Sequence, residues 1–237
     1  HLVLEGDPSL VDADRVAADL KKIVEAGRAA MGPFEYPHYY FLNMVVETGG
    51  GLEHRNSFLT MSNRFVTRTR QPYLNWLSLA AHEYFHNWNI KRLRPIELGP
   101  FDYETENHTR SLWVAEGVTD YYGALLVRRA GLTTTPEYLD MLSNSIEAVQ
   151  SRPGRRVQSA EMASFDSWIK QYRPDENSPN TSIDYYDKGA TIAFLLDAKI
   201  RKASGGRRTL DDAMRLAYRR HSGAKGFTPE QFQQAMS

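Results

Sequence analysis

The chain has 237 residues, enough for one large domain or two small ones with a sizeable buried core. Hydrophobic residues make up 41% and charged residues 24%, which excludes a disordered chain, a coiled coil or collagen as a description of the whole sequence. The 29 basic and 29 acidic residues balance, and this argues against a nucleic-acid binder. No apolar run approaches the roughly 18 residues that span a membrane, and the lack of cysteine excludes thiolate metal sites.

The first third of the chain predicts one helix and two strands. Apolar residues at steps of three and four over residues 16–31 predict a helix, with Gly27 inside its apolar stripe. Aromatic and β-branched residues over 39–46 predict a strand, and residues 52–61 predict a second strand with a polar face.

The remainder is predicted to be mainly helical. A helix over 75–90 is apolar on almost all sides and is therefore expected in the core, and a loop over 94–109 separates it from a second central helix over 111–130. Further helices are predicted from residue 135, over 188–202, and after the caps Thr209 and Thr228. We predict an α+β fold in one domain, 1–237, with a strand-containing part over about 1–70 and a helical part over about 71–237.

The strongest chemical signal is the run His82-Glu83-Tyr84-Phe85-His86. Residues i and i+4 lie about 40° apart on one face of a helix, so His82 and His86 can hold one Zn²⁺. Glu83 lies on a neighbouring face, from which its carboxylate can act on a water molecule as a general base. By chance such a run is expected on the order of 0.01 times in this chain, and these side chains would be costly in an apolar helix without a partner.

A catalytic zinc needs a third protein ligand and an open position. Glu116 lies in an otherwise apolar stretch of the second central helix, where that ligand is expected. Asp120 follows one turn later and could accept the second N–H of a ligand histidine, which would fix the tautomer of that ring. The alternative is that Glu116 and Asp120 form a polar pair on the helix surface.

These motifs together resemble a known family. The run His82–Asn89, then Arg92-Leu93-Arg94-Pro95, then Trp113-Val114-Ala115-Glu116-Gly117, is similar to the glycyl aminopeptidase family of zinc metallopeptidases. The resemblance covers about Phe34 to Ala198. It implies a thermolysin-like zincin fold with one Zn²⁺ per chain.

Members of that family usually also carry an N-terminal β-domain and a C-terminal PDZ domain. We expect this chain to be the catalytic piece without them. The resemblance leaves the oligomeric state open, and it leaves the compartment open between a bacterial periplasm and the cytoplasm.

Two further segments resemble the large zinc aminopeptidases. Gly50-Gly51-Leu52-Glu53-His54 is similar to their glycine-x-methionine-glutamate-asparagine strand, with leucine and histidine as departures. The resemblance implies that Glu53 binds the substrate amine, flanked by Gly51 and His54 in the substrate site. The alternative is a glycine-rich hairpin with a solvated glutamate.

The second segment is Tyr185-Tyr186-Asp187-Lys188-Gly189. It is similar to the tyrosine-glutamate-lysine-glycine segment whose tyrosine donates to the oxyanion, and this implies Tyr186 as the donor. Tyr185 stays open as the donor because the two tyrosines are adjacent, and both could instead pack at the start of a helix.

We therefore expect a zinc aminopeptidase that acts on peptides with a free N-terminus and favours small residues such as Gly and Ala. The metal ligands are His82, His86 and Glu116, and the general base is Glu83. Two alternatives remain: an endopeptidase with the same metal site, and a catalytically silent, metal-stabilised peptide-binding domain. No nucleic acid and no membrane span are expected.

Overall fold

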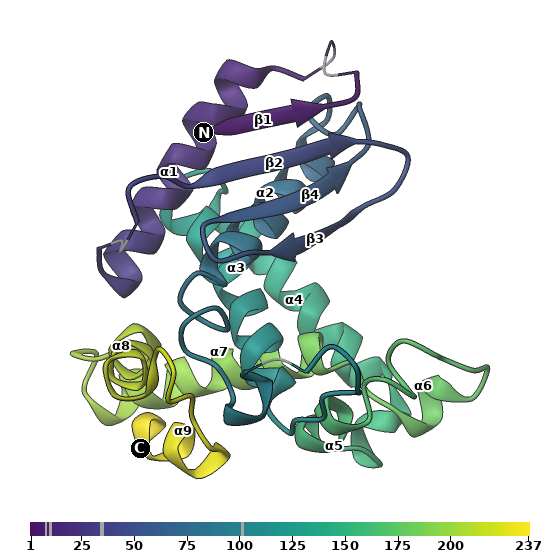
Figure 1. Ribbon diagram of the computed structural model, residues 1–237, viewed down its shortest axis with the longest axis vertical. Coiled ribbons are helices and arrows are strands. Elements are labelled where there is room, and N and C mark those ends of the chain that lie inside the picture. The colour runs from purple at the N-terminus through teal and green to yellow at the C-terminus, as the bar shows by residue number, and fades with distance from the viewer. Residues whose placement is uncertain (8, 10, 34–35, 101) are drawn as a thin grey trace. The chain divides into compact units, whose positions relative to one another are not determined.

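The computed structural model describes residues 1–7, 9, 11–33, 36–100 and 102–237 (Figure 1). Phe34, where the family resemblance begins, lies outside the described residues. The chain forms two compact units. The first comprises residues 1–91 and 122–139, and the second comprises residues 92–121 and 140–237. The predicted α+β fold is confirmed, with a small sheet in the first unit and helices in both.

The sheet has the strand order β1-β2-β4-β3. Its strands are β1 (Leu2–Glu5), β2 (Tyr40–Val45), β3 (Gly50–Glu53) and β4 (Ser57–Ser62). Strands β1, β2 and β4 are parallel, whereas β3 is an antiparallel edge strand in which Leu52 pairs with Leu59. The single strand expected over 52–61 is therefore wrong. The polar residues 54–56 form a turn, closed by the His54 amide donating to the Ser57 carbonyl at 2.8 Å, and two strands result.

Two helices of the first unit pack together, and one of them also packs on the sheet. Helix α1 (Ala13–Met31) begins at Asp12, whose side chain accepts from the Arg15 amide. Helix α2 (Arg70–Phe85) contacts α1 and also strands β3 and β4, behind which it lies in Figure 1. A Cβ atom on Gly27 of α1 would lie 2.8 Å from the Tyr84 ring of α2. The glycine is thus needed for this close approach.

A buried polar network joins α2 to the sheet. The Asn43 side-chain carbonyl accepts from the Trp76 indole at 3.1 Å and from the Thr60 hydroxyl at 2.9 Å, and the Asn43 amide donates to Ser62 at 3.0 Å. Asn43, Thr60 and Ser62 are buried on the inner face of β2 and β4. Because these buried polar groups have partners, their hydrogen bonds offset the cost of desolvation and fix α2 against the sheet.

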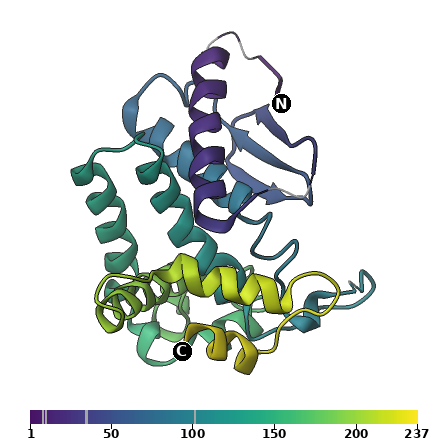
Figure 2. The same cartoon turned by 90° about the vertical axis from the view of Figure 1, so that its left-hand side faces the viewer.

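The second unit is helical. Its elements are η2 (Ile96–Leu98), η3 (Trp113–Val118), α3 (Thr119–Arg129), α4 (Thr135–Ser151), η4 (Pro153–Arg156), α5 (Ala160–Phe165), α6 (Ser178–Thr181), α7 (Tyr185–Ala203), α8 (Leu210–His221) and α9 (Pro229–Met236). Helices α3 and α4 lie partly in the first unit. Thr209 and Thr228 form the capping boxes of α8 and α9, and Figure 2 shows α9 next to α8. Within the described parts of the chain, no helix is both long and apolar enough to cross a membrane.

The helix expected over 111–130 begins with a π-helical turn, η3, before it continues as α3. Helices η3 and α7 meet at Gly117 and Gly189, and a Cβ atom on either glycine would overlap the backbone of the other helix. This contact brings together two segments that the sequence singles out, one with Glu116 and one with Tyr186.

Candidate functional site

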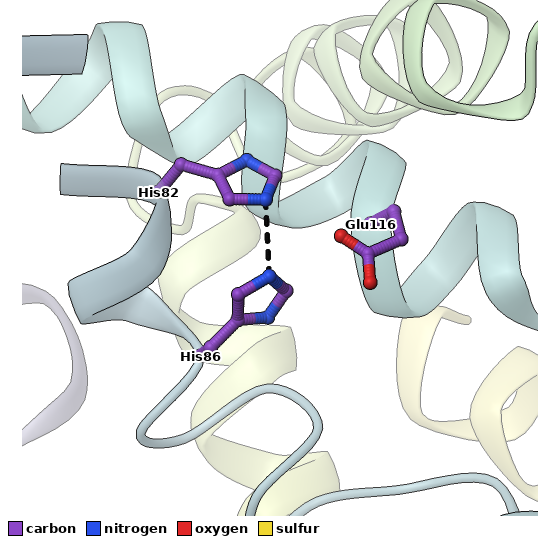
Figure 3. A group of neighbouring side chains, drawn as sticks. All are labelled: His82, His86 and Glu116. Atoms are coloured by element: carbon purple, nitrogen blue, oxygen red, sulfur yellow. Dashed lines mark hydrogen bonds between the residues drawn. The ribbon is translucent and has the colours of Figure 1, made fainter. Parts of the chain in front are cut away.

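The end of helix α2 carries two opposed histidine rings. His82 lies in the last turn of the helix and His86 is its C-cap residue, and both side chains are buried. Their Nε2 atoms are 3.0 Å apart (Figure 3). The predicted helix over 75–90 is therefore right in kind but begins and ends five residues too late, since the α-helix runs over Arg70–Phe85.

The tautomer of His86 follows from its second nitrogen. His86 Nδ1 lies 2.9 Å from the Asn89 carbonyl oxygen. A carbonyl only accepts, so Nδ1 carries the proton and Nε2 presents a lone pair. For the His86 ring, the Asn89 carbonyl has the role that the sequence suggested for Asp120, and the role of Asp120 stays a prediction.

This donor set fits a zinc ion. Ligands at 2.0–2.1 Å in a tetrahedral site are about 3.3 Å apart, close to the 3.0 Å between the two Nε2 atoms. Among the described residues, His82, His86 and Glu116 each offer one ligand atom, and these atoms lie within 4.8 Å of one another. Two imidazoles and one carboxylate are a known catalytic zinc set.

Within the first unit, helix α3 packs closely on helix α2. Helix α3 continues from η3, and its Tyr122 ring stacks on Phe85 with centroids 4.1 Å apart. A Cβ atom on Gly123 would lie 2.9 Å from the Ser78 carbonyl and 3.3 Å from Cβ of His82. Glu116 is half-buried on the π-helical turn that precedes this packed segment. Such turns occur often at functional sites.

Strand β3 borders the predicted base. Glu83 is buried, and a Cβ atom on Gly51 would overlap its carboxylate, so a side chain at this position would force the Glu83 carboxylate to move. Glu53 lies two residues further along the strand. Glu53, Glu83 and His86 form a second group whose possible ligand atoms lie within 4.8 Å of one another. The structure therefore brings together the predicted amine-binding residue and the predicted base.

Glu53 also has a partner that the sequence analysis did not single out. The Lys91 ammonium lies 3.2 Å from Glu53 Oε1, and only 23% and 17% of the two side chains are exposed. His54, by contrast, is exposed, and its Nδ1 lies 3.3 Å from the Leu52 carbonyl. The role of His54 in substrate binding stays a prediction.

Two adjacent tyrosines, Tyr185 and Tyr186, lie near Glu116 in the second unit. The Tyr185 ring is buried and its hydroxyl bonds to that of Tyr172 at 3.0 Å, while the Tyr186 ring stacks on Tyr185. Burial, and then the Glu116 carboxylate, raise the pKa of Tyr186 well above its usual value, so its hydroxyl stays protonated and can donate. The assignment of the oxyanion donor to Tyr186 stays a prediction.

A family model matches the stretch of the chain that carries most of the candidate residues. The model of the M61 glycyl aminopeptidase family matches residues 75–192, which contain His82, His86, Glu116 and Tyr186. Residues 75–192 are an M61 domain. A comparison with curated proteins gives no match.

A solved structure extends the likeness beyond the M61 domain. The crystal structure of an aminopeptidase N family protein from Idiomarina loihiensis is similar over 97% of this chain, with 36% identity and a TM-score of 0.93. The chain spans 40% of the length of that protein. The family model does not match strand β3, which carries Glu53. The similar structure covers 97% of the chain and so includes almost all of the first unit, to which β3 belongs.

Sequence reasoning missed three residues of the turn that follows the metal helix in the M61 domain: Asn89, Ile90 and Lys91. Ile90 is buried and has a backbone φ of 108°, which is rare for a β-branched residue. The Lys91 amide donates to the His86 carbonyl at 3.0 Å across this turn. A run of polar residues and one isoleucine carries no periodic signal that would reveal such a turn.

Proposed function

We propose that this chain is a zinc-dependent aminopeptidase domain that hydrolyses the first peptide bond of peptides with a free N-terminus, with a preference for small residues such as Gly and Ala. The peptidase class follows the family match and the similar structure. The zinc ion, the amine requirement and the residue preference are parts of the proposal.

His82, His86 and Glu116 would hold the metal ion. The opposed Nε2 atoms and the Asn89 carbonyl on the far side of the His86 ring support this assignment. When bound, zinc would polarise the scissile carbonyl and lower the pKa of a water molecule to about 7.

One observation carries the aminopeptidase assignment: Glu53 and Glu83 offer carboxylate oxygens within 4.8 Å of each other. In a substrate, the N-terminal nitrogen and the first carbonyl carbon are only about 2.5 Å apart, since they are joined through one Cα atom. A base and an amine-binding group that serve the same residue must therefore be neighbours. Glu53 would hold the ammonium while Glu83 takes a proton from water and returns it to the leaving amine.

Tyr186 would stabilise the oxyanion. A phenol that stays protonated is a neutral donor, and the raised pKa of this hydroxyl keeps it so over the working pH range. Tyr185, whose hydroxyl bonds to that of Tyr172, is the alternative donor.

A specific observation favours the second candidate, an endopeptidase. Glu53 already has a cation in Lys91, so a peptide without a free amine would not leave this carboxylate unpaired. Cleavage of N-acetylated peptides distinguishes the two activities, since a strict aminopeptidase refuses them.

The test combines metal analysis with a peptide-library cleavage assay on the intact natural protein. Wild type should bind one zinc per chain after chelation and reloading, and His82→Ala and His86→Ala should bind none. The products should be single N-terminal residues. Equal zinc in all three proteins, or cleavage of N-acetylated peptides, would contradict the proposal. Zinc binding without any cleavage would indicate the silent binding domain.

A further inference from the structure

The ion pair of Lys91 and Glu53 occupies the place where the substrate amine is expected. The Lys91 ammonium at 3.2 Å from Glu53 Oε1 makes the contact that an N-terminal ammonium would make with the same carboxylate. Both side chains are more than three-quarters buried, so this pair is screened less by solvent than a surface ion pair.

The backbone of Lys91 is held at the end of the metal helix. Its amide donates to the His86 carbonyl at 3.0 Å, and the preceding Ile90 is buried at a φ of 108°. Backbone conformations of this kind persist only where the surroundings impose them. The backbone of Lys91 is therefore fixed, while the flexible four-carbon stem allows the ammonium to move.

The Lys91 ammonium and a substrate ammonium on Glu53 would contact the same carboxylate, so the two positive charges would lie close together. In a partly buried site, two ammonium groups on one carboxylate repel each other.

We propose that Lys91 competes with the N-terminal ammonium of the substrate for Glu53, and thereby sets how strongly the site requires a free amine. A peptide with a free amine displaces the Lys91 ammonium, which turns on its flexible stem toward solvent. A peptide with a blocked amine leaves Lys91 in place, so that Glu53 never becomes a buried, unpaired carboxylate. Lys91 thus narrows the difference in affinity between free and blocked peptides. The inference depends on Glu53 as the amine-binding residue of the proposed function.

The test measures binding rather than turnover. The ligands are alanyl-alanine amide and its N-acetylated form, and the protein is the intact natural protein with Glu83→Gln, loaded with zinc, so that neither ligand is consumed. Calorimetry gives the ratio of the two dissociation constants, blocked over free. Lys91→Met removes the charge and keeps the apolar stem, and it should raise this ratio about tenfold.

Four further variants keep the result specific. Lys91→Gln, a second neutral variant, should raise the ratio as Lys91→Met does. It replaces Lys91→Met if that variant does not fold. Lys91→Arg keeps the charge and should leave the ratio within about twofold of the parent. Lys22→Met is the matched control: it breaks another partly buried lysine pair of the same unit, with Asp19 at 2.9 Å, and should not change the ratio. In a Glu53→Gln background, Lys91→Met should have no effect.

An unchanged or lower ratio in the neutral Lys91 variants would overturn the inference, because Lys91 would then have no effect on amine binding or would favour it. The same rise in the Glu53→Gln background would overturn it as well, since Lys91 would act elsewhere. Zinc content and peptide cleavage, measured with Glu83 intact, test the proposed function separately. If the protein is a zinc aminopeptidase but the ratio does not change when Lys91 is replaced, the inference is wrong and the proposed function stands.

Discussion

Gly117 and Gly189 lie backbone to backbone. A Cβ atom built on Gly189 would lie 2.6 Å from the Trp113 carbonyl and 2.8 Å from Cα of Gly117, and neither backbone atom can yield as a flexible side chain would. The two glycines follow Glu116 by one residue and Tyr186 by three. The close approach of η3 and α7 is therefore the reason that a proposed metal ligand and a proposed oxyanion donor come from helices in contact.

Gly189→Ala tests this contact. Helix propensity alone favours alanine over glycine by about 1 kcal/mol, but the added methyl group must push two backbones apart, which costs about 1–3 kcal/mol or more. We expect a net loss in the free energy of unfolding, measured by urea denaturation. Gly49→Ala is the control, because its Cβ would meet no atom nearer than 4.0 Å. A gain in stability for Gly189→Ala would show that the helices can separate without cost.

Glu83→Gln separates the base from the metal ligands. The amide is nearly isosteric and cannot accept a proton from water, so kcat should fall by at least about 10³-fold while zinc content stays at wild type. Metal analysis and single-turnover kinetics give the two readouts. Loss of zinc together with activity would instead favour the alternative ligand group of Glu53, Glu83 and His86.

Tyr186→Phe removes only a hydroxyl group. If Tyr186 donates to the oxyanion, kcat should fall by about 10²–10³-fold with KM and zinc content nearly unchanged. Tyr185→Phe should do much less, because the resemblance to the tyrosine-glutamate-lysine-glycine segment points to Tyr186 rather than to Tyr185. Steady-state kinetics on both variants decide between them. The opposite pattern would move the role to Tyr185, and normal kcat in both would remove it from this segment.

Glu53→Gln should weaken the use of substrates with a free amine. Removal of a charge-assisted pair costs about 2–5 kcal/mol in kcat/KM, and the lower end is expected here because Lys91 already competes for the carboxylate. The comparison of free and N-acetylated forms of one peptide isolates this contact. A variant that cleaves free-amine peptides at the wild-type rate would place amine recognition elsewhere.

Asp187 makes stability depend on pH. Burial, and then the carboxylates of Asp184 and Asp120, raise the pKa of Asp187 to about 6 from 3.8. The folded protein therefore holds this proton over about pH 4–6 while the unfolded chain has lost it. It follows that the Asp187 contribution to the free energy of unfolding falls as the pH rises through that window.

Asp187→Asn removes the contribution. The shift corresponds to about 3 kcal/mol at most, and partial exposure of the side chain reduces this to roughly 1–2 kcal/mol. The variant should be more stable than wild type by that amount at pH 8 and equally stable at pH 4. Urea denaturation with chelator present measures the difference across the range. A difference that does not vary with pH would contradict the raised pKa.

The sequence alone determined those features that depend on local periodicity and local chemistry. His82, Glu83 and His86 share a helix because a four-residue step is one helical turn, and Thr209 and Thr228 begin helices because their capping boxes act within four residues. The glycines beside Glu116 and Tyr186 were visible as parts of motifs.

Which groups complete the site depends on contacts between elements far apart in the chain. The pairing of Lys91 with Glu53 joins residues 38 positions apart in sequence number. The partner of His86 Nδ1 is the backbone carbonyl of Asn89, which cannot be predicted from the type of side chain. The split of residues 52–61 into β3 and β4, and the π-helical turn at Glu116, likewise depend on packing partners. Contacts of this kind are set by how the elements fold together, whereas helical spacing and caps are set by a few consecutive residues.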